Sequence, residues 1–193
     1  IRVAAVFGLV SLAVLIGTGD GSAYNVAKVQ PMKLAAMEGL YDGQKGAPLV
    51  AVGILDPDKE ILEEADEYTD PYLFDISIPG ALSLLANRSF DSFVPGIEDI
   101  INGGYMYEDP NGNMVEALSF DEKHQKGKLA VEGLKNYQLA LENGNDSLKT
   151  ASYAQLQDNF KYFGYSFLET PQESIPPVPL TFYAFRIMVI LGG

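Results

Sequence analysis

The sequence predicts a mostly α-helical protein in which an α-rich domain with a small β-hairpin is inserted between two transmembrane helices. Residues 3–17 carry no charge, and the C-terminal stretch VPLTFYAFRIMVILGG carries only one. The region between these ends holds most of the acidic residues that give the 193-residue chain a formal net charge of −13. A membrane span needs about 20 apolar residues, so both ends are interpreted as truncated spans. We expect the end of one transmembrane helix at 1–18, an extracytoplasmic domain at 19–176 and the start of the next helix at 177–193.

The N-terminal segment also has an alternative interpretation as a secretory signal. It has a basic start, a short apolar core and the small residues GSA, which are the parts of such a signal. A signal does not explain the second apolar segment at the C-terminus. Cytoplasmic loops tend to be basic, and this interior is acidic, which favours the outer side of the membrane.

The composition excludes several classes of function. The chain has no cysteine, so disulfide scaffolds, thiolate zinc sites and cysteine nucleophiles are excluded. Its single histidine, His124, lies in the polar stretch SFDEKHQKGK and is expected on the solvated surface. One histidine cannot provide both imidazole ligands of a haem. The negative charge argues against a nucleic-acid partner.

The interior predicts short elements separated by Pro and Gly. VQPMKLAAMEGLYDG indicates a short helix with Pro31 in its first turn and Gly39 or Gly43 at its end. KGAPLVAVGILDPDKE indicates an extended segment that ends in an Asp-Pro turn. YMYEDPNGNMVEAL indicates a β-hairpin around Asn111-Gly112. The stretch ISIPGALSLLANRSFDSFVPGIEDII combines a Pro-Gly break with a helical apolar repeat.

Two longer helices are predicted between these elements and the C-terminal span. Each has apolar residues at i, i+4, i+7 and i+11, the spacing of one helix face. The first set is Ala130, Leu134, Tyr137 and Leu141, and the second is Leu156, Phe160, Phe163 and Phe167. Such stripes are usually core, and we expect these two faces to pack the domain together.

The glycine cluster in GTGDGSAYN raises the question of a nucleotide site. Gly17, Gly19 and Gly21 give G-x-G-x-G, which is neither a dinucleotide turn nor a P-loop. We interpret these glycines instead as the place where the membrane helix gives way to the outer surface. The acidic insert 56–70 faintly resembles a calcium loop, but Ile61 stands where that loop requires glycine.

Lys33 and Glu38 are the charged residues of most interest in the short helix. Five residues apart, they diverge by about 140° on an ideal helix, which does not favour a local salt bridge. Two interpretations remain open. They are either two solvated charges on a surface helix, or a donor and an acceptor that border one pocket from two sides.

GDGSAYNVAKVQPMKLAAMEGLY resembles the start of the quinol-binding loop (Q-loop) in subunit I of cytochrome bd quinol oxidases. That family shows a Gly-Asp pair followed by Gln-x-x-Lys-Leu-Ala-Ala-x-Glu, which corresponds here to the segment from Gln30 to Glu38. SIPPVPLTFYAFRIMVILGG is similar to the start of the family's next helix. Two segments that lie between these ends, IPGALSLLANRS and FKYFGYSFLE, are also similar to the family's sequence. The acidic insert 56–70 has no clear counterpart in the family.

The resemblance implies a role for five residues. Lys33 and Glu38 would bind and oxidise quinol, with Gln30 beside them; a lysine can hydrogen-bond a quinol oxygen and a carboxylate can take its proton. Met188 would be an axial ligand of the low-spin haem b iron, a thioether that raises the haem potential. Arg186 would lie near that haem, and an arginine in an apolar span is functional by default.

The resemblance further implies a respiratory quinol oxidase that reduces dioxygen to water. Its cofactors would be the low-spin haem b and further haems b and d, and its partners a second cytochrome bd subunit, membrane quinol and the lipid bilayer. It would lie in the bacterial cytoplasmic (inner) membrane, and this fragment alone would be inactive. The alternative from another class is a secreted or membrane-anchored acidic binding domain without catalysis.

Overall fold

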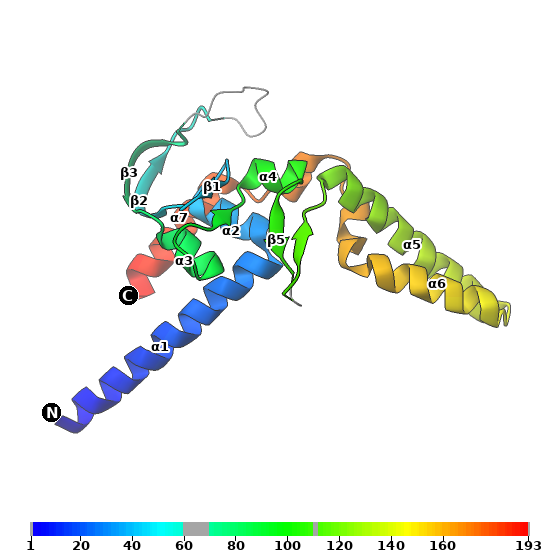
Figure 1. The fold of residues 1–193 in the computed structure, drawn as a ribbon, viewed down its shortest axis with the longest axis horizontal. Helices are drawn as coiled ribbons and strands as arrows, with labels where there is room; N and C mark the ends of the chain where they lie inside the picture. The colour runs from blue at the N-terminus through cyan, green and yellow to red at the C-terminus, as the bar shows by residue number, and fades with distance from the viewer. Residues whose placement is uncertain (1, 60–69, 110–111, 193) are drawn as a thin grey trace. The chain divides into compact units, whose positions relative to one another are not determined.

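The structure is a computed structural model that describes residues 2–59, 70–109 and 112–192. The chain forms two compact units, each described separately below. The first comprises residues 1–99, 108–113 and 176–193, and the second comprises residues 100–107 and 114–175. Helices predominate and the strands are short, as the sequence predicts (Figure 1).

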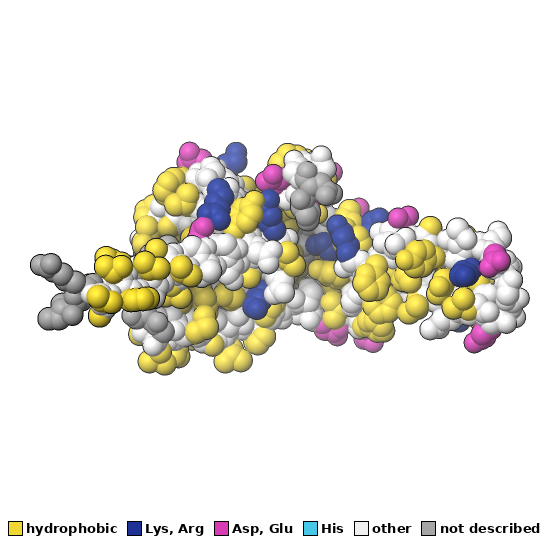
Figure 2. Space-filling model, turned by 90° about the horizontal axis from the view of Figure 1, so that it is seen from below, with side chains coloured by type: hydrophobic (Ala, Val, Ile, Leu, Met, Phe, Trp, Pro, Cys, Tyr) yellow, Lys and Arg dark blue, Asp and Glu magenta, His cyan; other side chains and the backbone are white. Residues whose placement is uncertain are grey.

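The first unit begins with one long helix, α1 (Arg2–Val29), which continues through the whole glycine cluster. The expectation that Gly17–Gly21 end this helix is therefore wrong. Glycine costs only about 1 kcal/mol in a helix interior, and nothing lies within 4 Å of a Cβ built at Gly17, Gly19 or Gly21. The large apolar side chains of α1 are exposed, and Figure 2 shows them along the N-terminal helix.

The short helix α2 (Pro31–Glu38) matches its prediction. Pro31 occupies the first turn, and Gly39 ends the helix in the left-handed conformation, with φ 62°. A Cβ at Gly39 would lie 2.7 Å from the hydroxyl of Tyr72, so both the backbone angle and the contact require glycine. Ala35 and Ala36 are buried, which allows α2 to pack closely against its surroundings.

The strands of the first unit pair across long stretches of sequence. β2 (Leu49–Leu55) pairs antiparallel with β3 (Tyr72–Ile78), and the expected acidic insert lies between them, with residues 60–69 outside the described part. β1 (Gln44–Lys45) pairs antiparallel with β4 (Phe93–Val94). The unit also contains α3 (Ala81–Asn87), and its last helix is α7 (Val178–Gly192), whose Val178 and Phe182 are buried.

Two short elements cross the division between the units: α4 (Ile97–Asn102) and β5 (Met106–Glu108). β5 pairs with β6 (Met114–Glu116), which confirms the predicted hairpin. The turn at Asn111 lies outside the described residues.

The second unit contains the two predicted long helices, α5 (Phe120–Glu142) and α6 (Asp146–Asn159). α5 begins with a complete capping box, in which the Ser119 side chain and the Glu122 side chain each bond the other residue's backbone N–H. α6 is followed by the 3₁₀ helices η1 (Phe160–Phe167) and η2 (Pro171–Ser174). Figure 1 shows α5 and α6 folded back on each other.

The two predicted apolar faces are confirmed only in part, since Ala130 is buried and Leu134 and Leu156 are half-buried. Phe160 and Phe167 are more than 60% exposed, and Leu141 is exposed as well. The fully buried positions of α5 and α6 include several small residues, of which only Ala130 belongs to the predicted set: Gly127, Ala130, Gly133, Ala140 and Ser152. A Cβ at Gly127 would lie 2.6 Å from the carbonyl oxygen of Tyr162, so the backbones approach more closely than larger side chains would permit.

Candidate functional site

The Lys-Glu pair of α2 is divided between surface and interior. Glu38, in the last turn, is only 5% exposed, whereas Lys33 lies on the exposed side of the helix. Their angular separation on the helix explains this difference, because residues five apart cannot share a face. No ion pair joins them among the described residues, in agreement with the expectation from spacing.

Glu38 forms an ion pair with Arg186 of α7. Arg186 Nη2 donates to Glu38 Oε2 at 2.8 Å and to the carbonyl oxygen of Val50 at 2.7 Å, and Nη1 donates to the carbonyl oxygen of Met37. The guanidinium carbon also lies 3.9 Å from the ring centroid of Phe182. Arg186 is 8% exposed, so both charges of this pair are withdrawn from water. A planar guanidinium suits such a site because it bonds several acceptors at once.

Burial and pairing act on the acidity of Glu38 in opposite directions. Desolvation penalises the carboxylate and raises the pKa of Glu38, and the charge and hydrogen bond of Arg186 offset part of this increase. The net pKa lies above the ordinary value of 4.5. A carboxylate whose pKa is raised accepts a proton more readily than a solvated glutamate does.

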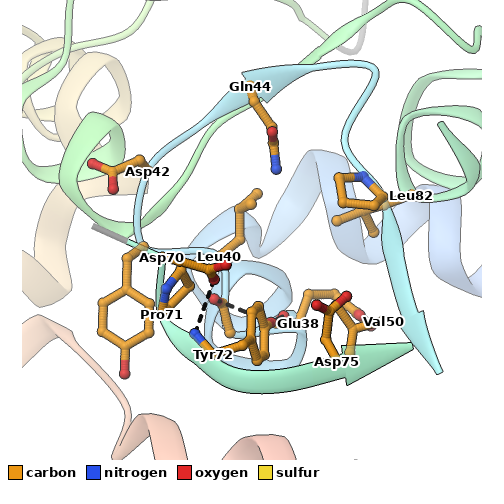
Figure 3. Close-up of a pocket in the computed structure, with 13 residues that line it drawn as sticks. Glu38, Leu40, Asp42, Gln44, Val50, Asp70, Pro71, Tyr72, Asp75 and Leu82 are labelled. Atoms are coloured by element: carbon orange, nitrogen blue, oxygen red, sulfur yellow. Dashed lines mark hydrogen bonds between the residues drawn. The ribbon is translucent and has the colours of Figure 1, made fainter. Parts of the chain in front are cut away.

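A cavity of about 190 Å³ adjoins Glu38 (Figure 3). Its walls come from the end of α2 and the following loop, from β2 and from β3. The lining includes four carboxylates, two tyrosines and an amide: Glu38, Asp42, Asp70, Asp75, Tyr41, Tyr72 and Gln44. An apolar cavity of about 150 Å³ is enough to hold a benzene ring, so this space matches one aromatic ring in size.

Tyr72 joins the cavity to the ion pair. Its hydroxyl donates to the carbonyl oxygen of Glu38 at 2.6 Å, and its ring lies 5.8 Å from that of Phe182. Burial raises the pKa of Tyr72 well above its usual range, so its hydroxyl stays neutral. Neither Tyr72 nor Asp75 was identified from the sequence. Their only local signal was a short β-prone run after the acidic insert.

The other predicted site residues on the N-terminal side are outside this cavity. Lys33 and Gln30 are exposed, and neither is among the residues that line it. The interpretation that Lys33 and Glu38 border one pocket therefore holds here for Glu38 alone. Asp20 of α1 forms an ion pair with Arg88, whose guanidinium lies over the ring of Tyr24.

Met188 and Arg186 were expected to bind a haem, and the two side chains lie in different surroundings. Met188 is 60% exposed on α7, so its thioether is accessible to a ligand outside the described chain. The guanidinium of Arg186 is held by Glu38 and by two carbonyl groups, and only its Nε is buried without a partner among the described residues. The axial-ligand role of Met188 and the place of Arg186 near a haem stay predictions, and within this chain the guanidinium of Arg186 bonds Glu38.

His124 is more enclosed than expected. It is half-buried in the second unit, where its Nδ1 lies 2.8 Å from the carbonyl oxygen of Tyr165 and its ring stacks on Phe120. His124 therefore keeps part of its surface exposed, in line with the expected surface position, while its ring packs on Phe120. Over the described ranges, no group of three or more His, Cys, Asp or Glu side chains is arranged to hold a metal ion.

Two segments of the described chain are long and apolar enough to cross a membrane, Val3–Val29 and Pro171–Leu191. Together with the buried Glu38–Arg186 pair beside a cavity, they describe the class: a mostly helical protein with two helices long and apolar enough to span a membrane. The sequence pattern of the family described as cytochrome bd terminal oxidase subunit I matches residues 1–193. The chain therefore belongs to the cytochrome bd terminal oxidase subunit I family.

Two relatives illustrate this membership. The chain is 29% identical over 199 residues to cytochrome bd-II ubiquinol oxidase subunit 1 of Escherichia coli (strain K12), covering 99% of this chain and 34% of that protein. It is 38% identical over 90 residues to a candidate cytochrome bd menaquinol oxidase subunit I of Bacillus subtilis (strain 168), covering 47% of this chain and 18% of that protein. The chain thus spans about a third of the length of the first relative and less of the second.

Proposed function

We propose that this chain is the quinol-oxidising part of a respiratory quinol:dioxygen oxidoreductase. The observation that carries the proposal is the buried Glu38, held by Arg186 at the wall of a cavity that matches one aromatic ring in size. The family membership supports the same reaction class, because the names of both relatives describe quinol oxidases.

The chemistry of the cavity supports quinol as the substrate. A quinol hydroxyl donates a hydrogen bond, and the lining is rich in acceptors, including the carboxylate of Glu38. Oxidation of the quinol releases protons, and a carboxylate with a raised pKa is suited to accept one of them. Lys33 and Gln30, both exposed at the same helix, would contact the part of the quinol that lies outside the cavity.

Met188 would hold the iron of a low-spin haem b as one axial ligand, and that haem would accept the electrons of the quinol. The accessible thioether on α7 supports this assignment. The second axial ligand, the haems b and d that reduce dioxygen to water, and the second subunit would lie outside this chain.

The apolar helices support a location in the bacterial cytoplasmic membrane. Residues 1–18 and 177–193 would belong to membrane spans, and residues 19–176 would lie on the outer face, where quinol would be oxidised. The helix α1 continues to Val29, so the membrane boundary would fall within a continuous helix and not at a helix end.

The proposal is tested by substitution in the complete oxidase. We expect Glu38→Gln to lower the rate of quinol oxidation by about 100-fold or more, the usual contribution of a general base. Lys33→Ala should raise the KM for quinol, with Lys135→Ala, an exposed lysine in the second unit, as the matched control. Haem content should stay normal in all three variants. Full activity of Glu38→Gln would refute the proposal.

The haem assignment is tested separately by absorption spectroscopy. Met188→Leu should change the spectrum of the low-spin haem b, because it removes an iron ligand. Met114→Leu, at another exposed methionine, serves as the control and should leave the spectrum as it is. An unchanged spectrum in Met188→Leu would exclude the ligand role.

A further inference from the structure

The strand β3 contributes two cavity residues that a regular strand could not place on one face. Tyr72 and Asp75 are three positions apart, and residues at odd spacing point to opposite sides of a strand. The register changes between Ile54, which pairs with Phe74, and Leu55, which pairs with Tyr72, so Leu73 is an extra residue. This β-bulge brings both Tyr72 and Asp75 to the cavity lining.

Glu38 and Asp75 differ in their access to water. Both line the same cavity, but Glu38 is buried and Asp75 is exposed. Figure 3 shows Glu38, Tyr72 and Asp75 at one end of the cavity and Gln44 at the other. The charges of Glu38 and Asp75 both act to raise the pKa of the Tyr72 hydroxyl, so the two carboxylates lie within electrostatic reach of the same group.

Tyr72, Tyr41 and Asp70 also line the cavity, and each is less suited to move a proton than Asp75. The hydroxyl of Tyr72 is committed to the backbone carbonyl of Glu38, and burial raises the pKa of Tyr41. Asp70 accepts a hydrogen bond from the backbone N–H of Tyr72 at 3.0 Å. Arg186, which bonds Glu38, is a permanent cation and takes no proton.

We propose that Asp75 carries the proton of Glu38 from the cavity to the solvent. This inference rests on the proposed quinol oxidation. Each time a quinol O–H bond breaks, an O–H bond would form on the Glu38 carboxylate, and one electron would leave the quinol to the acceptor that the proposed function assigns. The Glu38 O–H bond then breaks as one forms on Asp75, directly or through cavity water, and Asp75 releases the proton to the bulk. Glu38 regains its charge and its full attraction to Arg186 before the next turnover.

The test compares Asp75→Asn with Asp91→Asn in the complete oxidase. Asp91 is also exposed but does not line the cavity. We expect Asp75→Asn to lower kcat by about tenfold or more, within the range of a proton-transfer group, and to leave the KM for quinol almost unchanged. Added formate, a small carboxylic acid, should restore part of the rate in Asp75→Asn and should not accelerate Asp91→Asn.

The outcomes separate this inference from the proposed function. If Glu38→Gln is inactive while Asp75→Asn keeps its kcat, the inference fails and the proposed function stands. A loss in Asp75→Asn that formate does not relieve, or a change in KM alone, would also overturn the inference, because either result indicates a structural or binding role. Full activity of Glu38→Gln would refute both the proposed function and the inference about Asp75.

Discussion

The two units of this protein are stabilised in opposite ways. In the unit that holds the cavity, the central contact joins Glu38 to Arg186, 148 residues apart in the sequence, and it withdraws two charges from water. In the other unit, α5 and α6 are neighbours in the chain, and small residues let their backbones approach closely. The first arrangement costs desolvation energy and leaves Glu38 with a raised pKa, whereas the second depends on close packing of the backbone.

Loss of the Glu38–Arg186 ion pair should have the largest effect on the stability of the first unit. Arg186→Leu should destabilise the protein by about 3–5 kcal/mol, because it leaves a buried carboxylate without its partner. The thermal midpoint of the purified oxidase and the rate of proteolysis within residues 30–60 measure this effect. Arg186→Lys keeps the cation and should lose less. Equal stability of Arg186→Leu and the wild type would show that the pair contributes nothing.

The packing of the second unit is tested at its glycines. Gly127→Val should destabilise the packing of α5 against η1 by about 1–3 kcal/mol, since a Cβ would lie 2.6–2.7 Å from backbone atoms of Tyr162 and Ser166 that cannot move aside easily. Gly164→Val is the control, because nothing lies within 4 Å of a Cβ there. Proteolytic cleavage within residues 120–167 should accelerate only in Gly127→Val. Similar cleavage of the two variants would contradict the close-packing interpretation.

The pH dependence of quinol oxidation reports on the Glu38–Arg186 ion pair and does not require the variants to be obtained in equal amounts. Glu38 must be ionised to accept a proton, so kcat/KM should fall on the acidic side as pH drops through its pKa, which burial places above 4.5. Arg186 lowers that pKa, so Arg186→Gln should move the acidic limb to higher pH. The limb position does not depend on the amount of active enzyme. A limb that stays in place would indicate that another group controls it.

A smaller pH effect is expected in the second unit. Lys123 donates to the carbonyl oxygen of Ile100 at 2.8 Å, and burial lowers the pKa of Lys123 to about 8. Between pH 8 and the ordinary value of 10.5, the unfolded chain binds a proton that the folded chain lacks, so stability should rise with pH in this range. Lys123→Met should flatten that rise when the thermal midpoint is measured at several pH values. The same slope in both proteins would assign the effect elsewhere.

The sequence by itself determined the local features of this protein. Pro31 and Gly39 set the two ends of α2, because proline suits a first helical turn and glycine tolerates a positive φ. The β5–β6 hairpin and the apolar ends were predictable for the same reason, since each depends on residues close together in the chain. The sequence motif of α2 also identifies Glu38 as a candidate site residue, because that motif lies within nine consecutive residues.

Only the tertiary structure decided which charges meet and which faces are buried. The partner of Glu38 comes from the far end of the chain, and Asp75 reaches the cavity because one extra residue interrupts the pairing of β2 with β3. Phe160 and Phe167 have α-helical spacing in the sequence yet are exposed, because α6 ends at Asn159 and both lie in the 3₁₀ helix η1, whose turns differ in period. Periodicity identifies an apolar face, but the neighbour that covers it, and the distance of closest approach, depend on the folded backbone.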